Sequence, residues 1–209
     1  MTLPGAGEPP LAWPAVLAEG PVTLRPIRVR DARRWNAVRN ANRNWLEPWD
    51  ATTPSGDPPG PANFAQYARG LRRQARAGGA FPWLIEYQGT LAGQLTVSGI
   101  TRGPLLGGSM GYWVAEEFAG REIAPTAVAL AFDHCVTVGG LHRLELTIRP
   151  ENTASLRVVQ KLGFREEGVR RRFLHVAGEW RDHRVFALTG EEAPGGLMDR
   201  WRRVRRADA

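Results

Sequence analysis

Hydrophobic and polar positions alternate with period two in several short runs, and each of these runs predicts a β-strand. Residues 81–87 and 90–100 are joined by Gln88-Gly89, a spacing and composition typical of a β-hairpin. Further strands are predicted over residues 22–28, 109–114, 143–148 and 180–188, and another begins at Phe164.

Apolar residues recur at helical spacing in the segments between the strands. The clearest case is residues 125–138, where Pro125 suits the first turn of a helix and Gly139-Gly140 suits its end. Further helices are predicted after Asp31, over residues 63–77 and 152–162, and from Leu197. The order is strand, helices, three strands, helix, strand, helix, two strands. It predicts an α/β or α+β domain with a mixed sheet flanked by helices.

The composition fits one globular domain. Hydrophobic residues make up 43% of the 209 positions and charged residues 23%, which argues against disorder. The single cysteine, Cys135, excludes an internal disulfide framework and a multi-cysteine metal cluster, and no metal is expected. Residues 123–132, the longest nearly uncharged apolar stretch, reach about half of a membrane span. With no basic segment typical of a secretory signal in residues 1–20, we expect a cytoplasmic protein without membrane association.

Arginine dominates the charge of the chain. The formal net charge is +7, and of the 28 basic residues only Lys161 is a lysine. This balance favours anionic partners such as phosphates, an acidic protein or RNA. We expect a poorly ordered Pro/Gly-rich lead-in over residues 1–20, a compact domain over 21–190 and a basic C-terminal helix or tail over 191–209. That helix can pack on the body or contact RNA, and its apolar positions favour packing.

The candidate chemistry lies between residues 110 and 164. A strand ending at Val114 leads through a short glycine-containing loop into the helix at Pro125. A helix N-terminus offers unpaired backbone N–H groups and the positive end of the helix dipole, which suit a phosphate or pyrophosphate. Asn152 can cap the next helix or reach a ligand, and Ser155 lies one turn further on.

Three separated motifs resemble the GNAT superfamily of N-acetyltransferases, and within it the RimJ/RimL branch, which acetylates N-terminal α-amino groups of ribosomal proteins. They are Trp45-Leu-Glu-Pro-Trp49, then Asn152-Thr-Ala-Ser155 with Lys161-Leu-Gly-Phe164, then Gly178-Glu-Trp-Arg-Asp-His183 with Phe186-Ala-Leu-Thr189. The resemblance extends from about residue 22 to residue 189. It implies the GNAT fold, a single mixed and splayed central sheet flanked by helices.

The resemblance implies acetyl transfer from acetyl-CoA to an amine, first of all the N-terminal α-amino group of a ribosomal protein. The candidate catalytic residues are Ser155, beside the departing thiolate, and Asn152, on the cofactor arm. The implied cofactor-binding residues are these two together with Val114, Ala119, Gly120, Arg121, Glu122, Ile123 and Ala124. The implied acceptor-binding residues are Trp45, Glu47, Trp49, Trp180 and Asp182. The oligomeric state is left open between monomer and homodimer.

The chain departs from the family pattern at two places. In the loop over residues 119–124, Ala119 stands where the family has an Arg or Gln, and Glu122 stands where it has a glycine. Loss of the glycine costs on the order of 1 kcal/mol if the backbone at residue 122 has a positive φ. A carboxylate beside a pyrophosphate is also repulsive unless it turns away, so we expect weakened cofactor affinity. In addition, Leu174 stands where some relatives carry a glutamate base. The remaining candidates for a base are Glu145, Asp182 and His183.

Many family members place a tyrosine in the helix that begins near residue 152. Here Tyr67, Tyr87 and Tyr112 all lie upstream, so that acid role falls to Ser155 or to no residue. Two alternative functions stay open at this point. One is acetylation of a small amine such as an antibiotic or polyamine. The other is a catalytically impaired module that binds the ribosome or RNA through its arginines.

Overall fold

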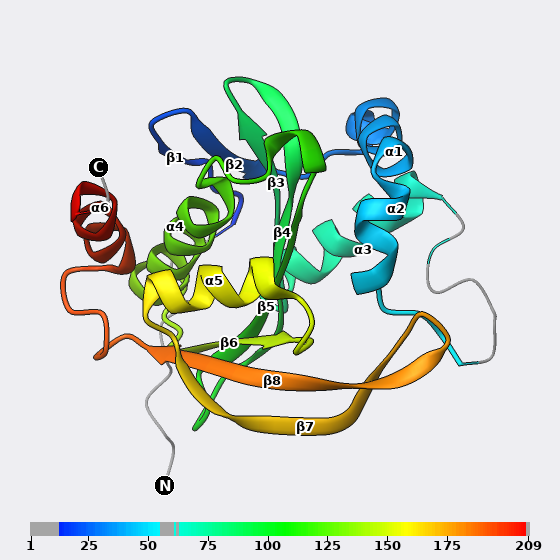
Figure 1. The fold of residues 1–209 in the computed structure, drawn as a ribbon. Coiled ribbons are helices and arrows are strands. Elements are labelled where there is room, and N and C mark those ends of the chain that lie inside the picture. Colours follow the sequence, from blue (N-terminus) through cyan, green and yellow to red (C-terminus); the bar gives the residue numbers. More distant parts are fainter. Residues whose placement is uncertain (1–12, 55–60, 62, 208–209) are drawn as a thin grey trace, which may run out of the picture.

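The computed structural model describes residues 13–54, 61 and 63–207. Within them, eight strands form one sheet in the order β1-β2-β3-β4-β5-β6-β8-β7 (Figure 1). The strands are β1 (Leu17–Glu19), β2 (Val22–Pro26), β3 (Phe81–Tyr87), β4 (Thr90–Thr101), β5 (Gly107–Val114), β6 (Arg143–Ile148), β7 (Arg165–Val176) and β8 (Glu179–Thr189). All neighbouring strands are antiparallel except β5 and β6. The predicted mixed sheet is therefore confirmed.

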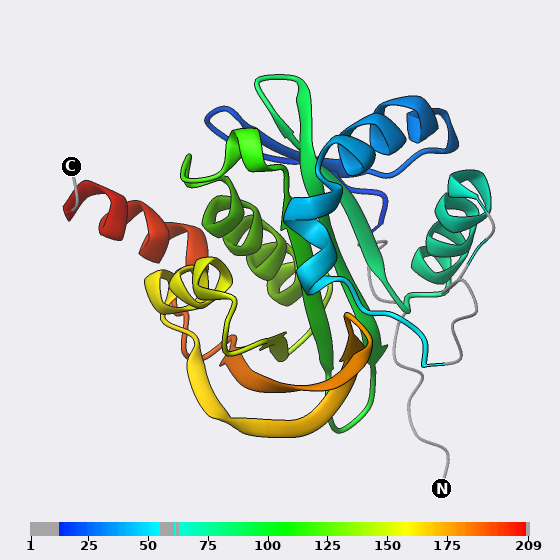
Figure 2. The same cartoon turned by 45° about the vertical axis from the view of Figure 1, so that its right-hand side comes forward.

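Helices cover both faces of this sheet (Figures 1 and 2). They are α1 (Ala32–Ala41), α2 (Arg43–Leu46), α3 (Phe64–Arg76), α4 (Ile123–Thr137), α5 (Thr153–Leu162) and α6 (Leu197–Ala207), with short 3-10 turns η1 (Val29–Asp31), η2 (Glu47–Trp49) and η3 (Glu116–Phe118). The larger hydrophobic core lies on the side of α4, α5 and α6. A smaller one, centred on Ile27, Phe64 and Leu84, lies under α1 and α3.

Local signals in the sequence account for most element boundaries. Asn63 caps α3 by accepting a hydrogen bond from the Gln66 N–H at 3.0 Å, and Gly163 ends α5 in the left-handed conformation that glycine favours. The strand predicted over residues 143–148 is β6. Asp31 differs from expectation, because its carboxylate accepts from the Arg28 N–H and pairs with Arg25 instead of capping α1.

The segment before the predicted domain is more closely tied to it than expected, whereas the C-terminal helix packs on the domain as its apolar positions favour. Residues 1–12 lie outside the described residues, but the lead-in prediction is wrong for residues 13–20. There Trp13 is buried against Phe81 and Trp83, and β1 pairs with β2. At the other end, α6 packs on α4 through the fully buried Trp201. The apolar face of this helix therefore packs on the domain and is not available to solvent or RNA.

The junction of β5 and β6 is the feature of the fold that positions the site. These parallel strands pair only where Gly107–Ser109 face Arg143–Glu145. Beyond that point β5 continues beside β4, and β6 continues beside β8, so the two strands diverge (Figure 2). The second half of β5 consequently presents backbone N–H and C=O groups along an edge that β6 does not cover.

Candidate active site

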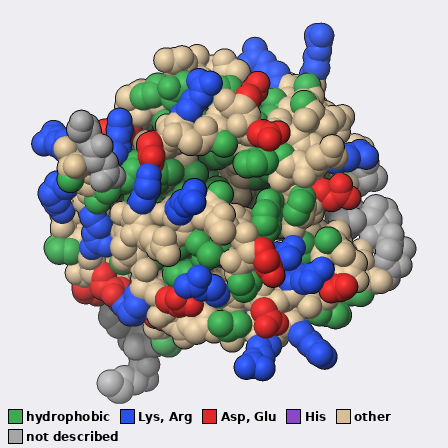
Figure 3. Space-filling model, viewed as in Figure 1, with side chains coloured by type: hydrophobic (Ala, Val, Ile, Leu, Met, Phe, Trp, Pro, Cys, Tyr) green, Lys and Arg blue, Asp and Glu red, His purple; other side chains and the backbone are tan. Residues whose placement is uncertain are grey.

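A cavity of about 1100 Å³ opens where β5 and β6 diverge. Its walls come from β4, β5, the start of α4 and the start of α5, and from the segment around α2 and η2. Figure 3 shows a hollow near the centre of this face, with hydrophobic side chains around it. Of the described residues, no group of three or more His, Cys, Asp or Glu is arranged to hold a metal ion. Nor is any helix in that part of the chain long and apolar enough to cross a membrane.

The loop into α4 lines one end of the cavity, as the sequence predicts. Ala119, Gly120, Glu122, Ile123 and Ala124 all contribute to the lining. Gly120 has φ +75° and Glu122 has φ +59°, which turns the chain sharply into the helix. Because the first N–H groups of a helix have no partner within it, the donors of Ile123 and Ala124 stand at the cavity. This end therefore has the geometry of an anion site.

The Glu122 carboxylate is neutralised by the only lysine of the chain. Lys161 Nζ lies 2.6 Å from Glu122 Oε1, and the same ammonium stands 5.8 Å from the centre of the Trp201 ring. The charge that replaces the family glycine is therefore directed towards α5 and paired. The left-handed backbone at Glu122 still costs about 1 kcal/mol relative to glycine.

Asn152 and Ser155 both line the cavity, but their roles differ from a simple pair of ligand contacts. Asn152 Oδ1 accepts a hydrogen bond from the Ser155 backbone N–H at 3.0 Å and so caps α5. That oxygen is committed to the helix, and it fixes the first turn on which Ser155 sits. Tyr112 also lines the cavity, and its hydroxyl is buried.

The two tryptophans of the early motif form the opposite wall. Trp45 Nε1 donates to the Val114 carbonyl at 3.1 Å, which joins this segment to the end of β5. Trp49 stacks under the Arg149 guanidinium at 5.5 Å, and Arg149 also donates to the Pro48 carbonyl. Both indoles remain about one-third exposed, at 36% and 37%. They are therefore walls of the cavity and do not belong to the core.

Several predicted site residues lie elsewhere. Glu47, Arg121, Trp180 and Asp182 do not line the cavity. Arg121 stacks on Phe118, Trp180 packs against His175 in the β7–β8 hairpin, and Asp182 accepts a hydrogen bond from the Arg172 N–H. Neither Trp180 nor Asp182 lines the cavity, so their assignment to the acceptor side stays a prediction.

The three candidate bases are also outside the cavity. Glu145 is held by Arg143 and Arg170 on the β6 side of the sheet. His183 is buried in β8, and burial lowers its pKa although a hydrogen bond to the Arg181 carbonyl opposes the shift. Among the described residues, the carboxylates that do line the cavity are Asp50, Glu122 and Glu151, and each has a cationic partner: Arg39, Lys161 and Arg149.

Sequence reasoning missed the buried polar residues that hold the cavity walls together. Gln94 accepts from Trp35 Nε1 at 2.8 Å and donates to the Tyr67 hydroxyl at 2.6 Å. Asn42, directly after α1, accepts from the Glu116 N–H at 2.8 Å and so ties the end of α1 to η3, which precedes the loop into α4. A polar residue at an apolar position of β4 was the available signal for Gln94. No local signal distinguishes Asn42.

A sheet that splays beside a helix N-terminus, with an aromatic wall opposite, defines this chain as a GNAT N-acetyltransferase. The family model described as "Acetyltransferase (GNAT) domain" matches residues 22–165, and the chain belongs to that family. Among solved structures it is similar to Mycobacterium smegmatis RimJ in complex with CoA-disulfide. Identity is 41% and the TM-score 0.84, covering 90% of this chain and 94% of that one.

Two curated relatives agree with this assignment. The probable N-acetyltransferase YjcK of Bacillus subtilis is 28% identical over 80% of this chain and 93% of its own length. The [ribosomal protein uS5]-alanine N-acetyltransferase of Escherichia coli is 25% identical over 80% of this chain and 87% of its own length. The chain is thus a RimJ/RimL-like member of the family, as its motifs predicted.

Proposed function

We propose that the cavity binds acetyl-CoA and transfers its acetyl group to the N-terminal α-amino group of a protein. The observation that carries this proposal is the divergence of β5 from β6 next to the N-terminus of α4. The uncovered edge of β5 suits an extended amide-containing arm, and the α4 end suits a pyrophosphate. Acetyl-CoA contains both groups, and when bound it would supply the reactive thioester.

The residues of this chain fit that cofactor, although Val114 on β5 and Glu122 before α4 each differ from a simple binding group. The Val114 carbonyl already accepts from Trp45, so the binding edge is strongest over the preceding residues of β5. At the pyrophosphate end, Lys161 keeps the Glu122 carboxylate paired. Ser155 lines the same cavity and offers a hydroxyl donor to the sulfur from which the acetyl group is transferred.

The acceptor side disfavours a polyamine. A polycation needs unpaired carboxylates, but each described carboxylate that lines the cavity has an arginine or lysine partner. Aromatic walls from Trp35, Trp45 and Trp49 instead suit a single amine at the end of a peptide. The name of the Escherichia coli relative, a [ribosomal protein uS5]-alanine N-acetyltransferase, supports a ribosomal protein as the acceptor, and such an acceptor places the reaction in the cytoplasm.

The attacking amine must lose a proton, and we assign that proton to water. The carboxylates of the described cavity are ion-paired, and the pKa of Glu151 is lowered by its backbone hydrogen bond and by Arg149, which makes it a poorer base. The rate is therefore expected to rise with pH until the acceptor amine itself is neutral, near pH 8 for an α-amino group (about 7.7–8.0).

The test is thiol release from acetyl-CoA with a panel of short peptides that differ in their first residue. Spermidine and an N-terminally blocked copy of each peptide are the controls. Release with free but not blocked peptides is expected, and mass spectrometry should place the acetyl group on the first residue. Acetylation of spermidine alone would overturn the protein acceptor. No release, together with steeply salt-dependent RNA binding, would favour the non-catalytic alternative.

A further inference from the structure

A series of hydrogen bonds joins β4, α1 and α3 on the aromatic side of the cavity. Gln94 and Thr96 lie two positions apart on β4 and point to the same face of the sheet, whereas Leu95 between them belongs to the core under α4. Gln94 is 5% exposed, and its partners Trp35 and Tyr67 come from α1 and α3. These side chains therefore lie on the face of the sheet opposite the helix that the proposed function assigns to the cofactor.

The Trp35 indole determines the orientation of the Gln94 amide. An indole N–H can only donate, so the Gln94 atom that lies 2.8 Å from Trp35 Nε1 must be the amide oxygen. The amide nitrogen then faces the other way, where it donates to the Tyr67 hydroxyl at 2.6 Å and to Thr96 Oγ1 at 3.2 Å. Both hydroxyl oxygens accept from the same nitrogen and consequently stand side by side.

Each of these two hydroxyls still has its own proton to donate. In the part of the chain that the structure describes, neither Tyr67 nor Thr96 donates that proton to a side-chain or backbone acceptor. Both residues line the cavity. Burial raises the pKa of Tyr67, although the hydrogen bond from Gln94 opposes the shift, so the phenol stays protonated at neutral pH. The two O–H groups are therefore a pair of donors available to a ligand in the cavity.

We propose that the Tyr67 and Thr96 hydroxyls donate hydrogen bonds to the first peptide carbonyl of the acceptor, and so select a peptide N-terminus over a plain amine. The inference rests on the proposed function and names the part of the acceptor that is recognised. Two donors suit a carbonyl oxygen, which has two lone pairs, whereas an ammonium can only donate and finds no acceptor here. In a peptide the first carbonyl carbon is two bonds from the α-amino nitrogen, so holding the carbonyl also positions the amine.

Gln94 is the positioning residue of this donor pair, and a carboxylate in its place would reverse the hydrogen bonds with little change of shape. In Gln94→Glu one carboxylate oxygen still accepts from Trp35 Nε1, but the other has no hydrogen to donate. Tyr67 and Thr96 would then donate to that oxygen, which turns their protons away from the cavity. This substitution therefore changes the direction of the two O–H groups while both side chains remain.

The kinetic test compares a short peptide with a copy in which a trans alkene replaces the first peptide bond, so that the shape is kept and the carbonyl oxygen is lost. We expect Tyr67→Phe to lower kcat/KM for the peptide about tenfold, mainly through KM, and to leave the alkene copy unchanged. Thr96→Val and Gln94→Glu should also lower the preference for the peptide. Tyr87→Phe removes a hydroxyl outside the cavity and should be neutral. Equal losses for the two acceptors, or a wild-type preference in Gln94→Glu, would overturn the inference.

A binding measurement that needs no turnover separates this inference from the proposed function. The full chain, saturated with coenzyme A, is titrated calorimetrically with the peptide and with its alkene copy. We expect the peptide to bind about tenfold more tightly, and Tyr67→Phe to remove most of that difference. If this holds in a protein that never acetylates the peptide, the donor pair stands and the proposed function fails. If the wild-type protein acetylates the peptide but binds both ligands equally, the donor pair is refuted and the proposed function stands.

Discussion

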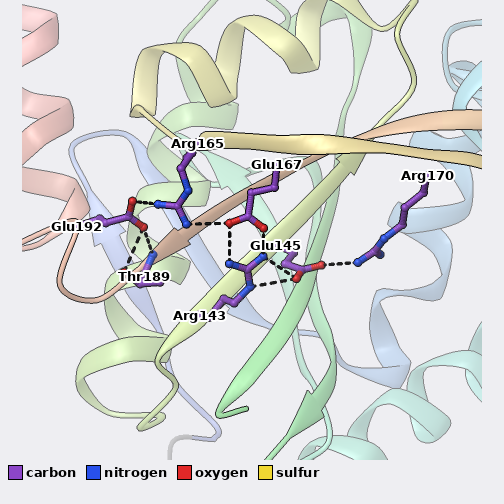
Figure 4. Close-up of polar contacts among 7 residues, drawn as sticks. All are labelled: Arg143, Glu145, Arg165, Glu167, Arg170, Thr189 and Glu192. Atoms are coloured by element: carbon purple, nitrogen blue, oxygen red, sulfur yellow. Dashed lines mark hydrogen bonds and ion pairs between the residues drawn. The ribbon is translucent and has the colours of Figure 1, made fainter. Parts of the chain in front are cut away.

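The two ends of the β5–β6 junction differ in their polar groups: one end carries ion-paired side chains and the other mostly neutral groups. At the closed end, where the strands pair, Arg143 binds Glu145 and Glu167 together, and Arg170 also reaches Glu145 (Figure 4). Arg165 extends this network from Glu167 to Glu192, which in turn accepts from the Thr189 N–H. We call these residues the closed-end network. Nearly every charge in it has an opposite partner.

At the open end, the groups that face the cavity are mostly neutral donors and acceptors without strong partners. They include the Tyr112 hydroxyl, the uncovered edge of β5 and the first N–H groups of α4. The Glu122 carboxylate at this end is paired with Lys161. Ion pairs therefore link the strands at the closed end, whereas neutral hydroxyl and backbone groups lie at the open end.

The largest expected effect comes from the helix that supports the open end. Trp201 of α6 is 1% exposed, and its Nε1 donates to Thr126 Oγ1 in the first turn of α4 at 2.9 Å. Trp201→Ala should lower the free energy of unfolding by about 3–5 kcal/mol, measured by urea denaturation. The control is Trp180→Ala, at a residue that is 54% exposed, where the loss should stay within about 0.5 kcal/mol. Equal losses for the two variants would show that α6 does not support α4.

The next effect concerns the paired charges of the open end. Lys161→Ala leaves the Glu122 carboxylate unpaired beside the proposed pyrophosphate site, and should weaken acetyl-CoA binding about tenfold, or about 1.4 kcal/mol, in calorimetric titration. Adding Glu122→Gln should restore the affinity, because the repulsive charge is then gone. Arg203→Ala removes a positive charge from the exposed face of α6 and serves as the control. If the double variant binds as weakly as Lys161→Ala, then Lys161 itself contacts the cofactor.

A smaller effect is expected at the cap of α5. Asn152→Ala removes the acceptor of the Ser155 N–H and should cost about 1 kcal/mol of stability, whereas Asn152→Ser keeps an acceptor and should lose much less. If Asn152 acts only as a cap, acetyl-CoA affinity follows stability across the two variants. An Asn152→Ser protein that is stable yet binds poorly would instead show that the Asn152 amide contacts the ligand, as the family resemblance implies.

The sequence predicted those parts of the fold that local patterns encode. The hairpin signal around Gln88-Gly89 located β3 and β4, the period-two run over residues 143–148 located β6, and the Asn63 and Gly163 signals located helix ends. It missed β1 and the burial of Trp13, since a short strand in a Pro/Gly-rich segment is stabilised by tertiary pairing. The residues that line the cavity from the loop into α4 and from the start of α5 were predictable, because the backbone groups at a helix start are set by where the helix begins in the sequence.

Contacts between side chains that are distant in the sequence could not be predicted from local patterns. Glu122 and Lys161 lie 39 positions apart, and only the packing of α5 against α4 brings them together. The hairpin residues Trp180 and Asp182 were assigned to the acceptor side from a motif, but the direction of a side chain depends on the twist and bulges of β7 and β8.

The smallest effect is expected in the closed-end network and concerns pH. Hydrogen bonds from Arg143, and then from Arg165, lower the pKa of Glu167 to about 2. A carboxyl whose pKa is lower in the folded state stabilises the protein above its ordinary pKa, and this contribution is lost as the pH falls from about 4.5 towards 2. Glu167→Gln should therefore flatten the acid limb of the stability profile over that interval.

Glu167 remains partly exposed, so the loss at pH 7 should be less than about 1 kcal/mol. Glu117→Gln, at an exposed position of η3, is the control for removing a carboxylate. Urea denaturation at several pH values measures both variants, and calorimetry should find the acetyl-CoA affinity of Glu167→Gln unchanged, because the closed end does not face the cavity. A loss of affinity without a change in the acid limb would mean that the closed-end network sets the divergence of β5 and β6, so that the two ends of the junction are coupled.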